Sequence, residues 1–212
     1  MILFDHLKKC FKLTAQTADP QSMRRGVCHA YSAVADTPAA KHPFPVGREF
    51  AEAIGYDKSV LDALPPATTE SFTGVSNVSV FAEIPNGATV VDLGCGTGVD
   101  SLIAAQKTGA SGQVLGIDFS LSMLKKGRRA IRATETNNLT FLCADAERLP
   151  LLDKTVDRVM VNGIFNLNPD RAEIIKEIYR ILKPGGKIFG AELIANKTQR
   201  RQKITSLSQW MA

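Results

Sequence analysis

The sequence lacks the features of several protein classes. No apolar run approaches the roughly 18 residues that a membrane-spanning helix needs. The first 13 residues mix charged with apolar side chains and have no small-residue cleavage site, so they do not resemble a secretory signal. The four cysteines, Cys10, Cys28, Cys95 and Cys143, form no CxxC pair. We therefore expect reduced thiols in a cytoplasmic protein rather than a disulfide framework, and no metal site.

Beyond residue 45 the sequence has no histidine, and its basic clusters have no aromatic platform beside them. All three histidines, His6, His29 and His42, fall within the first 45 residues, so no general base is evident. The net charge is only +5. The basic clusters at 125–132 and 197–203 have no aromatic stacking platform beside them. We read them as solvated helix faces, and we expect neither nucleic acid nor a membrane as partner.

The chain divides into an N-terminal arm and one domain. With 212 residues it suits one domain with an N-terminal elaboration. Residues 1–45 begin with a short amphipathic helix over 1–13 and end in a segment with prolines at 38, 43 and 45, which we interpret as an arm or cap. Residues 46–212 form the second unit, with short helices and loops over 46–85 and a ligand-binding core over 88–193.

Strands and helices alternate from residue 88 onward. β-Branched and apolar runs predict strands over 89–93, 114–118, 139–145, 156–161 and 187–193. Helical spacing predicts helices over 99–107, 121–134 and 169–182, with a helix stop and turn at 183–186 and a last helix from about 197. This alternation predicts an α/β fold with a doubly wound, Rossmann-like parallel sheet.

The glycine-rich segment 92–98 joins the first strand to the first helix. Glycines there permit a tight turn and a close approach of a ligand to the backbone, beside the positive end of the helix. The dinucleotide pattern G-x-G-x-x-G is absent, because it would require glycine at Val99. The pattern is G-x-G-x-G, preceded by Asp92. Thr97 and Asp100 have the spacing of a capping box.

The ends of four predicted strands each supply a polar residue: Asp92, Asp118, Asp145 and Asn162. The carboxyl ends of parallel strands form the ligand-binding edge of such a sheet. A carboxylate at Asp118 can accept both hydroxyls of a ribose, and one at Asp145 can accept a hydrogen bond from an adenine amino group. The alternative is an α/β domain whose strands end in these residues only because aspartate and asparagine favour loops.

In combination, four segments resemble the class I S-adenosylmethionine-dependent methyltransferases: VDLGCGTG at 91–98, GID at 116–118, ADAERLP at 144–150 and LKPGGK at 182–187. The resemblance implies S-adenosylmethionine as cofactor, with glycines around its methionine part, Asp118 at the ribose, and Phe119, Met123, Asp145 and the Ala146 backbone at the adenine. Tyr31 and Phe165 are candidates for an aromatic face near the sulfonium. The expected cofactor-binding set is Tyr31, Asp92, Gly94, Gly96, Thr97, Gly98, Asp118, Phe119, Met123, Asp145, Ala146 and Asn162.

The flanks, over about 25–200, resemble the arsenite methyltransferases. Three stretches carry this likeness: 54–65, 73–77 and 162–171. That branch binds arsenic through cysteine thiolates, but the matching positions here are Val75 and Gly163. The chain therefore resembles this branch but lacks its arsenic-binding cysteines.

The resemblance implies a sheet with two further strands after the fifth. We expect this chain to lack them, which would leave the fifth strand as an edge. An exposed edge invites pairing, so we expect a homodimer through this edge or a covering by the arm.

Three functions stay open from sequence. The first is methyl transfer to a small-molecule acceptor, such as a thiol or metalloid-like species. The second is a non-catalytic or truncated S-adenosylmethionine-binding module. The third is an RNA or protein methyltransferase. For the third, the Asn/Asp-Pro-Pro-aromatic motif that favours amino-group targets is absent, since the segment after the fourth strand reads Asn162-Gly163-Ile164-Phe165.

Overall fold

The structure is a computed structural model, and it describes residues 20–194. The helices expected over 1–13 and from about 197 therefore lie outside the described residues. Among residues 20–194, no helix has both the length and the apolar character that crossing a membrane requires.

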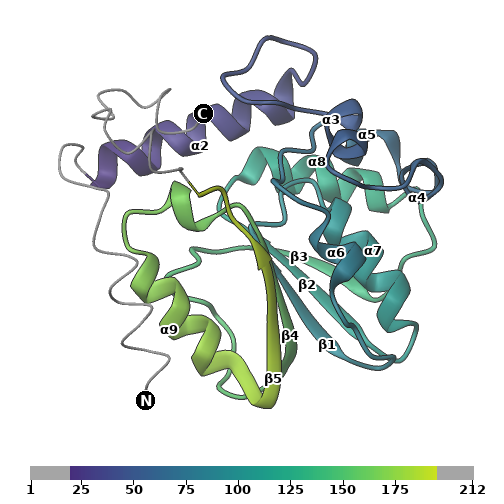
Figure 1. Cartoon of the computed structure of the whole chain (residues 1–212), viewed down its shortest axis with the longest axis vertical. Helices are drawn as coiled ribbons and strands as arrows, with labels where there is room; N and C mark the ends of the chain where they lie inside the picture. Colours follow the sequence, from purple (N-terminus) through teal and green to yellow (C-terminus); the bar gives the residue numbers. More distant parts are fainter. Residues whose placement is uncertain (1–19, 195–212) are drawn as a thin grey trace.

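A parallel sheet of five strands forms the centre (Figure 1). The strands are β1 Thr89–Leu93, β2 Gln113–Asp118, β3 Leu139–Cys143, β4 Val156–Asn162 and β5 Leu182–Ala191. Their order is β3-β2-β1-β4-β5, and every neighbouring pair is parallel. The chain thus winds outward from β1 to β3 and then crosses to the other side of β1. This confirms the predicted doubly wound α/β fold and puts β5 at an edge.

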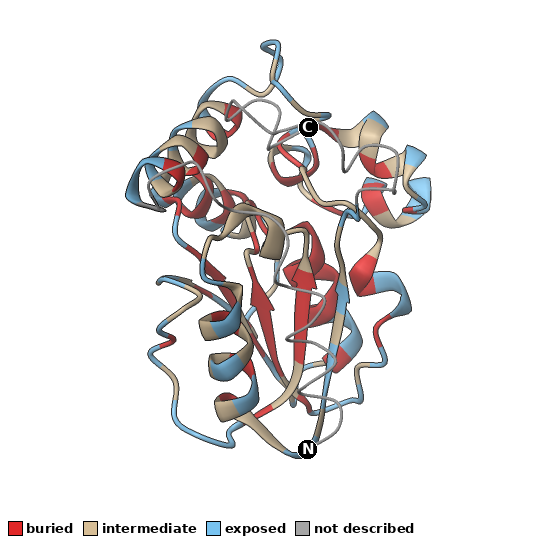
Figure 2. Cartoon of the chain, turned by 60° about the vertical axis from the view of Figure 1, so that its left-hand side comes forward, coloured by how far each residue is buried: buried red, intermediate tan, exposed pale blue. Residues whose placement is uncertain are grey.

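Helices cover both faces of the sheet. Successive strand residues point to opposite sides, so an apolar strand has apolar side chains on both faces. On one face, Val91 and Leu93 of β1 pack with Ile178 of helix α9 (Arg171–Ile181). On the other lie α7 (Val99–Thr108) and α8 (Leu121–Ile131). Figure 2 shows the central strands buried between these layers. Burial on both faces explains why the strands are continuous apolar runs.

Several element boundaries differ from the prediction. β3 ends at Cys143, so Asp145 lies in the loop after the strand rather than within it. α8 ends at Ile131, and α9 spans 171–181 rather than 169–182. The largest difference is β5, which begins at Leu182 rather than at 187. Val156 pairs with Leu182 and Arg158 pairs with Lys187, so the predicted turn at 183–186 is an irregularity inside the strand.

The N-terminal segment, predicted as a helical arm or cap, contributes a long helix, α2 (Pro20–Asp36), whose bounds the sequence pattern did not predict. Proline suits its first position because that N–H has no intrahelical partner. Pro38 prevents continuation beyond Asp36. The other short elements are α3 Arg48–Ala53, α4 Lys58–Asp62, α5 Pro66–Thr69, α6 Val78–Phe81 and the 3-10 helix η1 Phe165–Leu167.

α2 is packed against α8 through apolar and polar contacts. Val34 and Ala35 of α2 are buried against Met123 of α8. Lys126 of α8 donates to the carbonyl of Ala35 at 3.2 Å and to the hydroxyl of Ser71 at 2.8 Å. These contacts hold α2 across the end of the sheet to which the strands point (Figures 1 and 2).

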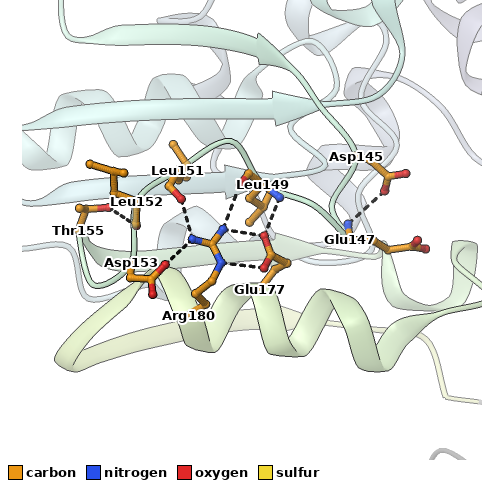
Figure 3. A network of polar contacts seen from close by, with 9 residues as sticks. All are labelled: Asp145, Glu147, Leu149, Leu151, Leu152, Asp153, Thr155, Glu177 and Arg180. Carbon is orange, nitrogen blue, oxygen red and sulfur yellow. Dashed lines mark hydrogen bonds and ion pairs between the residues drawn. The ribbon is translucent and has the colours of Figure 1, made fainter.

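The segment between β3 and β4 is fastened to α9 by Arg180 (Figure 3). Its guanidinium donates to the carbonyls of Leu149 and Leu151, at 3.0 and 2.7 Å, and to Asp153 at 2.8 Å. It also forms two bonds of 2.7 Å to Glu177. These hydrogen bonds raise the pKa of Arg180. The network fixes the segment that carries Asp145, and so it shapes one end of the site described below.

Replacing Arg180 with leucine is expected to lower the free energy of unfolding by about 2–3 kcal/mol, because Glu177 and two carbonyls lose their donor. Urea unfolding followed by circular dichroism measures the change. Lys176→Leu is the matched control, since Lys176 pairs with Glu173 on the exposed side of α9 and should change stability by under about 0.5 kcal/mol. Equal effects of the two variants would contradict the structural role of Arg180.

Candidate functional site

A cavity opens at the carboxyl ends of the strands, where the strand order reverses at β1. It brings together most of the residues predicted from sequence, as the topology of such sheets requires. The predicted residues that line it are Tyr31, Asp92, Gly94, Gly96, Thr97, Asp118, Phe119, Asp145, Ala146 and Asn162.

Gly98, Met123 and Phe165 do not line this cavity. Gly98 caps α7 with φ +94°, and a Cβ there would stand 2.4 Å from Cζ of Phe141. It therefore serves the turn rather than the cavity wall. Met123 is fully buried between α8 and α2. Phe165 packs against the core on the α9 side.

Asp118 ends β2 with a buried carboxylate, 8% exposed. Its Oδ2 accepts the N–H of Gly96 at 2.9 Å, and its Oδ1 accepts the N–H of Ser120 at 2.7 Å. Burial raises the pKa of Asp118 while these backbone donors lower it. A carboxylate oxygen has two lone pairs, so each oxygen keeps one for a ligand. Asp118 thus ties down the glycine-rich loop and still presents two acceptors to the cavity.

Two further glycines of the loop, Gly94 and Gly96, have different roles. Gly94 has φ +79°, and a Cβ there would stand 2.2 Å from Cγ2 of Ile164. Gly96 has φ +54° and lines the cavity, yet a Cβ there would have no atom within 4 Å. Gly94 therefore permits close packing within the protein, whereas Gly96 leaves space in the cavity beside Asp118 that a ligand can occupy.

The capping-box prediction for Thr97 and Asp100 is wrong. Gly98 is the N-cap and makes no side-chain cap, and the Thr97 hydroxyl donates to the carbonyl of Thr68 at 2.8 Å. Asp100 turns into the cavity wall and accepts the Tyr56 hydroxyl at 2.5 Å and the N–H of Ser79 at 3.1 Å. The sequence spacing could not reveal these partners, because they come from the segment before β1.

Asp92, at the centre of the sheet, is 1% exposed and accepts the Ser101 hydroxyl at 2.5 Å. Burial and the neighbouring Asp100 raise the pKa of Asp92 well above its usual range, which favours its neutral form. The cavity still contains an excess of acids, because Asp100, Asp118 and Asp145 also line it. Such a lining favours a ligand that carries positive charge.

Asn162 lines the cavity but spends its hydrogen bonds within the protein. Its Oδ1 accepts the N–H groups of Val75 and Ser76, at 2.8 and 3.1 Å. Its Nδ2 donates to the carbonyl of Ser76 at 2.7 Å and to Asp100 at 2.9 Å. An amide offers two lone pairs and two N–H donors. Asn162 therefore positions the 74–77 loop rather than offering a free group to a ligand.

Replacing Asn162 with alanine is expected to lower the free energy of unfolding by about 2–4 kcal/mol, because two N–H groups and a carboxylate lose their partner. Amide hydrogen exchange should show the N–H groups of Val75 and Ser76 losing protection in the folded state. Asn86→Ala is the control, since Asn86 bonds Ser111 at the exposed surface. Unchanged protection at residues 75 and 76 would contradict the assigned role.

Helix α2 forms the roof of the cavity with residues that the sequence reading mostly missed. Arg24, Val27 and Tyr31 all line the cavity. Their spacing of three and four residues places them on one helical face, and this was the available signal. Tyr31 stacks on Phe44 with ring centroids 5.2 Å apart. Burial, with Asp118 nearby, raises the pKa of Tyr31, so its hydroxyl stays protonated.

The side of the cavity formed by the segment after β4 and by residues 73–74 is uncharged. It is formed by Thr73, Gly74, Gly163, Ile164, Leu167 and Asn168. Val75 and Gly163 lie against each other here, since a Cβ on Gly163 would stand 2.9 Å from Cγ1 of Val75. Cys95 is the thiol in the described cavity wall, and burial raises its pKa well above the usual value. The described wall therefore offers no pair of thiolates.

A family model described as a methyltransferase domain matches residues 84–211. The chain belongs to the class I, S-adenosylmethionine-dependent methyltransferases. The match includes all five strands and the glycine-rich loop, in agreement with the resemblance of the motifs.

Curated relatives of this methyltransferase domain are named for different methyl acceptors. An arsenite methyltransferase of Halobacterium salinarum is 32% identical over 143 residues, which are 68% of this chain and 36% of the relative. A demethylmenaquinone methyltransferase of Listeria welshimeri is 37% identical over 106 residues, which are 50% of this chain and 44% of the relative. The chain thus spans less than half the length of these relatives.

A solved structure supports the fold. The arsenic (III) S-adenosylmethionine methyltransferase of Chlamydomonas reinhardtii is 31% identical, with a TM-score of 0.59. The alignment covers 64% of this chain and 48% of that one.

Proposed function

We propose that this chain binds S-adenosylmethionine in the cavity at the carboxyl ends of β1 to β4 and methylates a small, uncharged acceptor. The observation that carries the proposal is the buried carboxylate of Asp118, which keeps a free lone pair on each oxygen beside the open space at Gly96. Two adjacent acceptors match the two hydroxyls of a ribose.

The other groups of the cavity fit the same ligand. Phe119 is 43% exposed and lines the cavity, so its ring can stack against a purine. Asp145 supplies an acceptor for an exocyclic amino group. The excess of carboxylates suits the positive charges of a sulfonium and an ammonium group. Bound S-adenosylmethionine supplies a methyl group on a positively charged sulfur, which a nucleophile can displace directly.

The chain's contribution to this reaction is positioning. Holding an acceptor in line with a methyl group can supply much of the rate. The roof residue Tyr31 and the floor residue Asp118 enclose the site from α2 and β2. No histidine lines the described cavity, so we propose that the acceptor does not depend on a histidine base. No catalytic base is assigned.

The uncharged wall formed by the segment after β4 and by residues 73–74 supports an uncharged organic acceptor. The relatives are named for arsenite and for a demethylmenaquinone. A thiophilic metalloid needs thiolates, but Val75 and Gly163 occupy the positions that match the arsenite branch's cysteines. The uncharged wall with Ile164 and Leu167 suits an apolar molecule better.

Calorimetric titration with S-adenosylmethionine and S-adenosylhomocysteine tests cofactor binding, and micromolar affinity is the expected result. Absence of binding would contradict the proposal. A transfer assay with methyl-labelled S-adenosylmethionine then compares hydroquinones with arsenite. Turnover of hydroquinones supports the proposed acceptor class, whereas turnover of arsenite alone contradicts it. Cofactor binding without turnover of any acceptor would favour the non-catalytic binding module.

Three further expectations remain proposals. Cys28, Cys95 and Cys143 are free thiols, which supports a reducing compartment such as the cytoplasm. The outer edge of β5 pairs with no strand among residues 20–194, which supports a homodimer through that edge. Of the basic residues on α8, Lys126 binds Ser71 and Glu70, and Arg128 binds the carbonyl of Phe141. Their use within the protein supports the expectation that nucleic acid is not a partner.

A further inference from the structure

Arg24 connects the roof of the cavity to the segment after β3. Its Nη1 donates to Oδ2 of Asp145 at 3.0 Å, and its Nη2 contacts Oε2 of Glu147. The two carboxylates lie more than 120 residues further along the chain. Among the described residues that line the cavity, Arg24 is the only one with a positively charged side chain.

Asp145 is held from two sides. Arg24 binds its Oδ2, and the N–H of Glu147 donates to its Oδ1 at 3.1 Å, which Figure 3 shows as a dashed line. Each oxygen keeps one lone pair. The side chain of Asp145 is 47% exposed and lines the cavity, so a ligand can reach these lone pairs.

Arg24 also compensates charge at this end of the cavity. Glu147 follows Asp145 by two residues, and its side chain is only 15% exposed. Its Oε1 has no hydrogen-bond partner within the described part of the chain. Without Arg24, two neighbouring carboxylates would face each other, one of them largely buried and uncompensated. Asp145 would then turn away from Glu147 and lose its fixed direction.

We propose that Arg24 is a positioning residue that makes the cavity selective for a purine with an amino group at position 6. The inference rests on the proposed function, since it concerns the adenine end of the same site. A carboxylate that Arg24 fixes in place is purely an acceptor. It matches the N–H donors of a 6-amino group and repels the oxygen of a 6-oxo group, so the preference arises from both attraction and repulsion.

Calorimetric titration with S-adenosylhomocysteine and S-inosylhomocysteine tests this role, because the two ligands differ at position 6 and in the proton that the oxo form carries on N1. The unmodified chain is expected to bind the amino ligand about 30-fold more tightly or better. In Arg24→Met, binding of the amino ligand should weaken about 10-fold and binding of the oxo ligand should change little. Arg24→Lys should restore part of the ratio, because lysine keeps the charge but not the two-pronged contact.

Two further variants complete the test. Lys125→Met removes a positive charge from an exposed position of α8 and should leave the ratio unchanged. Asp145→Asn should shift the preference toward the oxo ligand, because a carboxamide can also donate. An equal loss for both ligands in Arg24→Met, which leaves the ratio unchanged, would show that Arg24 only holds α2. Unchanged affinities for both ligands would show that it does not act on Asp145. Either result overturns the inference. Failure of the unmodified chain to bind either ligand would instead overturn the proposed function.

Discussion

Asp118→Ala is expected to abolish the binding of S-adenosylhomocysteine, with a loss of at least about 100-fold. The change removes both acceptors that face the cavity. It also removes the partner of the Gly96 N–H, which lies 2.9 Å from Oδ2, so the glycine-rich loop loses its fixed position. Two effects on one site act in the same direction. Calorimetric titration measures the loss of affinity, and circular dichroism checks that the variant is folded.

Asp157→Ala is the matched control for this experiment. Asp157 also accepts a backbone N–H, that of Thr89 at 2.9 Å, and it binds Lys183 at 2.8 Å. These contacts lie at the opposite end of β1 and β4 from the cavity. The control should therefore lose stability but bind the ligand normally. Binding by Asp118→Ala within about 3-fold of the unmodified chain, a difference below about 1 kcal/mol, would contradict the ribose assignment.

Gly96→Ala is expected to reduce mainly ligand affinity, whereas Gly98→Ala is expected to reduce mainly the stability of the fold. At Gly96 the new methyl group meets no atom within 4 Å, and φ is +54°. The left-handed backbone there should lower the free energy of unfolding by only about 1–2 kcal/mol. Because Gly96 lines the cavity, the methyl group occupies space that a ligand needs, and affinity should fall at least 10-fold, which corresponds to about 1.4 kcal/mol.

Gly98→Ala combines a strained backbone with a steric clash. Its φ is +94°, and the new Cβ would stand 2.4 Å from Phe141. Overpacking and strain together should lower the free energy of unfolding by about 3 kcal/mol or more. Urea unfolding and calorimetric titration of both variants give the comparison. The assignment of the two glycines would be refuted if Gly96→Ala bound the ligand normally, or if Gly98→Ala were as stable as Gly96→Ala.

The layered fold and the position of the site follow from local patterns in the sequence. β1 to β4 each contain an apolar run, and this local pattern is enough to place them. The start of β5 was missed, because its first residues read as a turn. Parallel strands carry their carboxyl ends to one edge. Asp92, Asp118 and Asp145 therefore had to meet there, together with the glycine-rich loop, once the alternation of strands and helices was recognised.

Which of these residues are free to bind a ligand depends on contacts between distant segments of the chain. Asn162 and Asp118 are both the last residues of strands. Asn162 uses all four hydrogen bonds within the protein, whereas Asp118 keeps two lone pairs. Spacing alone suggested a cap for Asp100, but its partners Tyr56 and Ser79 lie in the segment before β1. Arg24 meets Asp145 across 121 residues of chain. Such contacts depend on how distant segments pack, because no local periodicity encodes the partner of a side chain from another element.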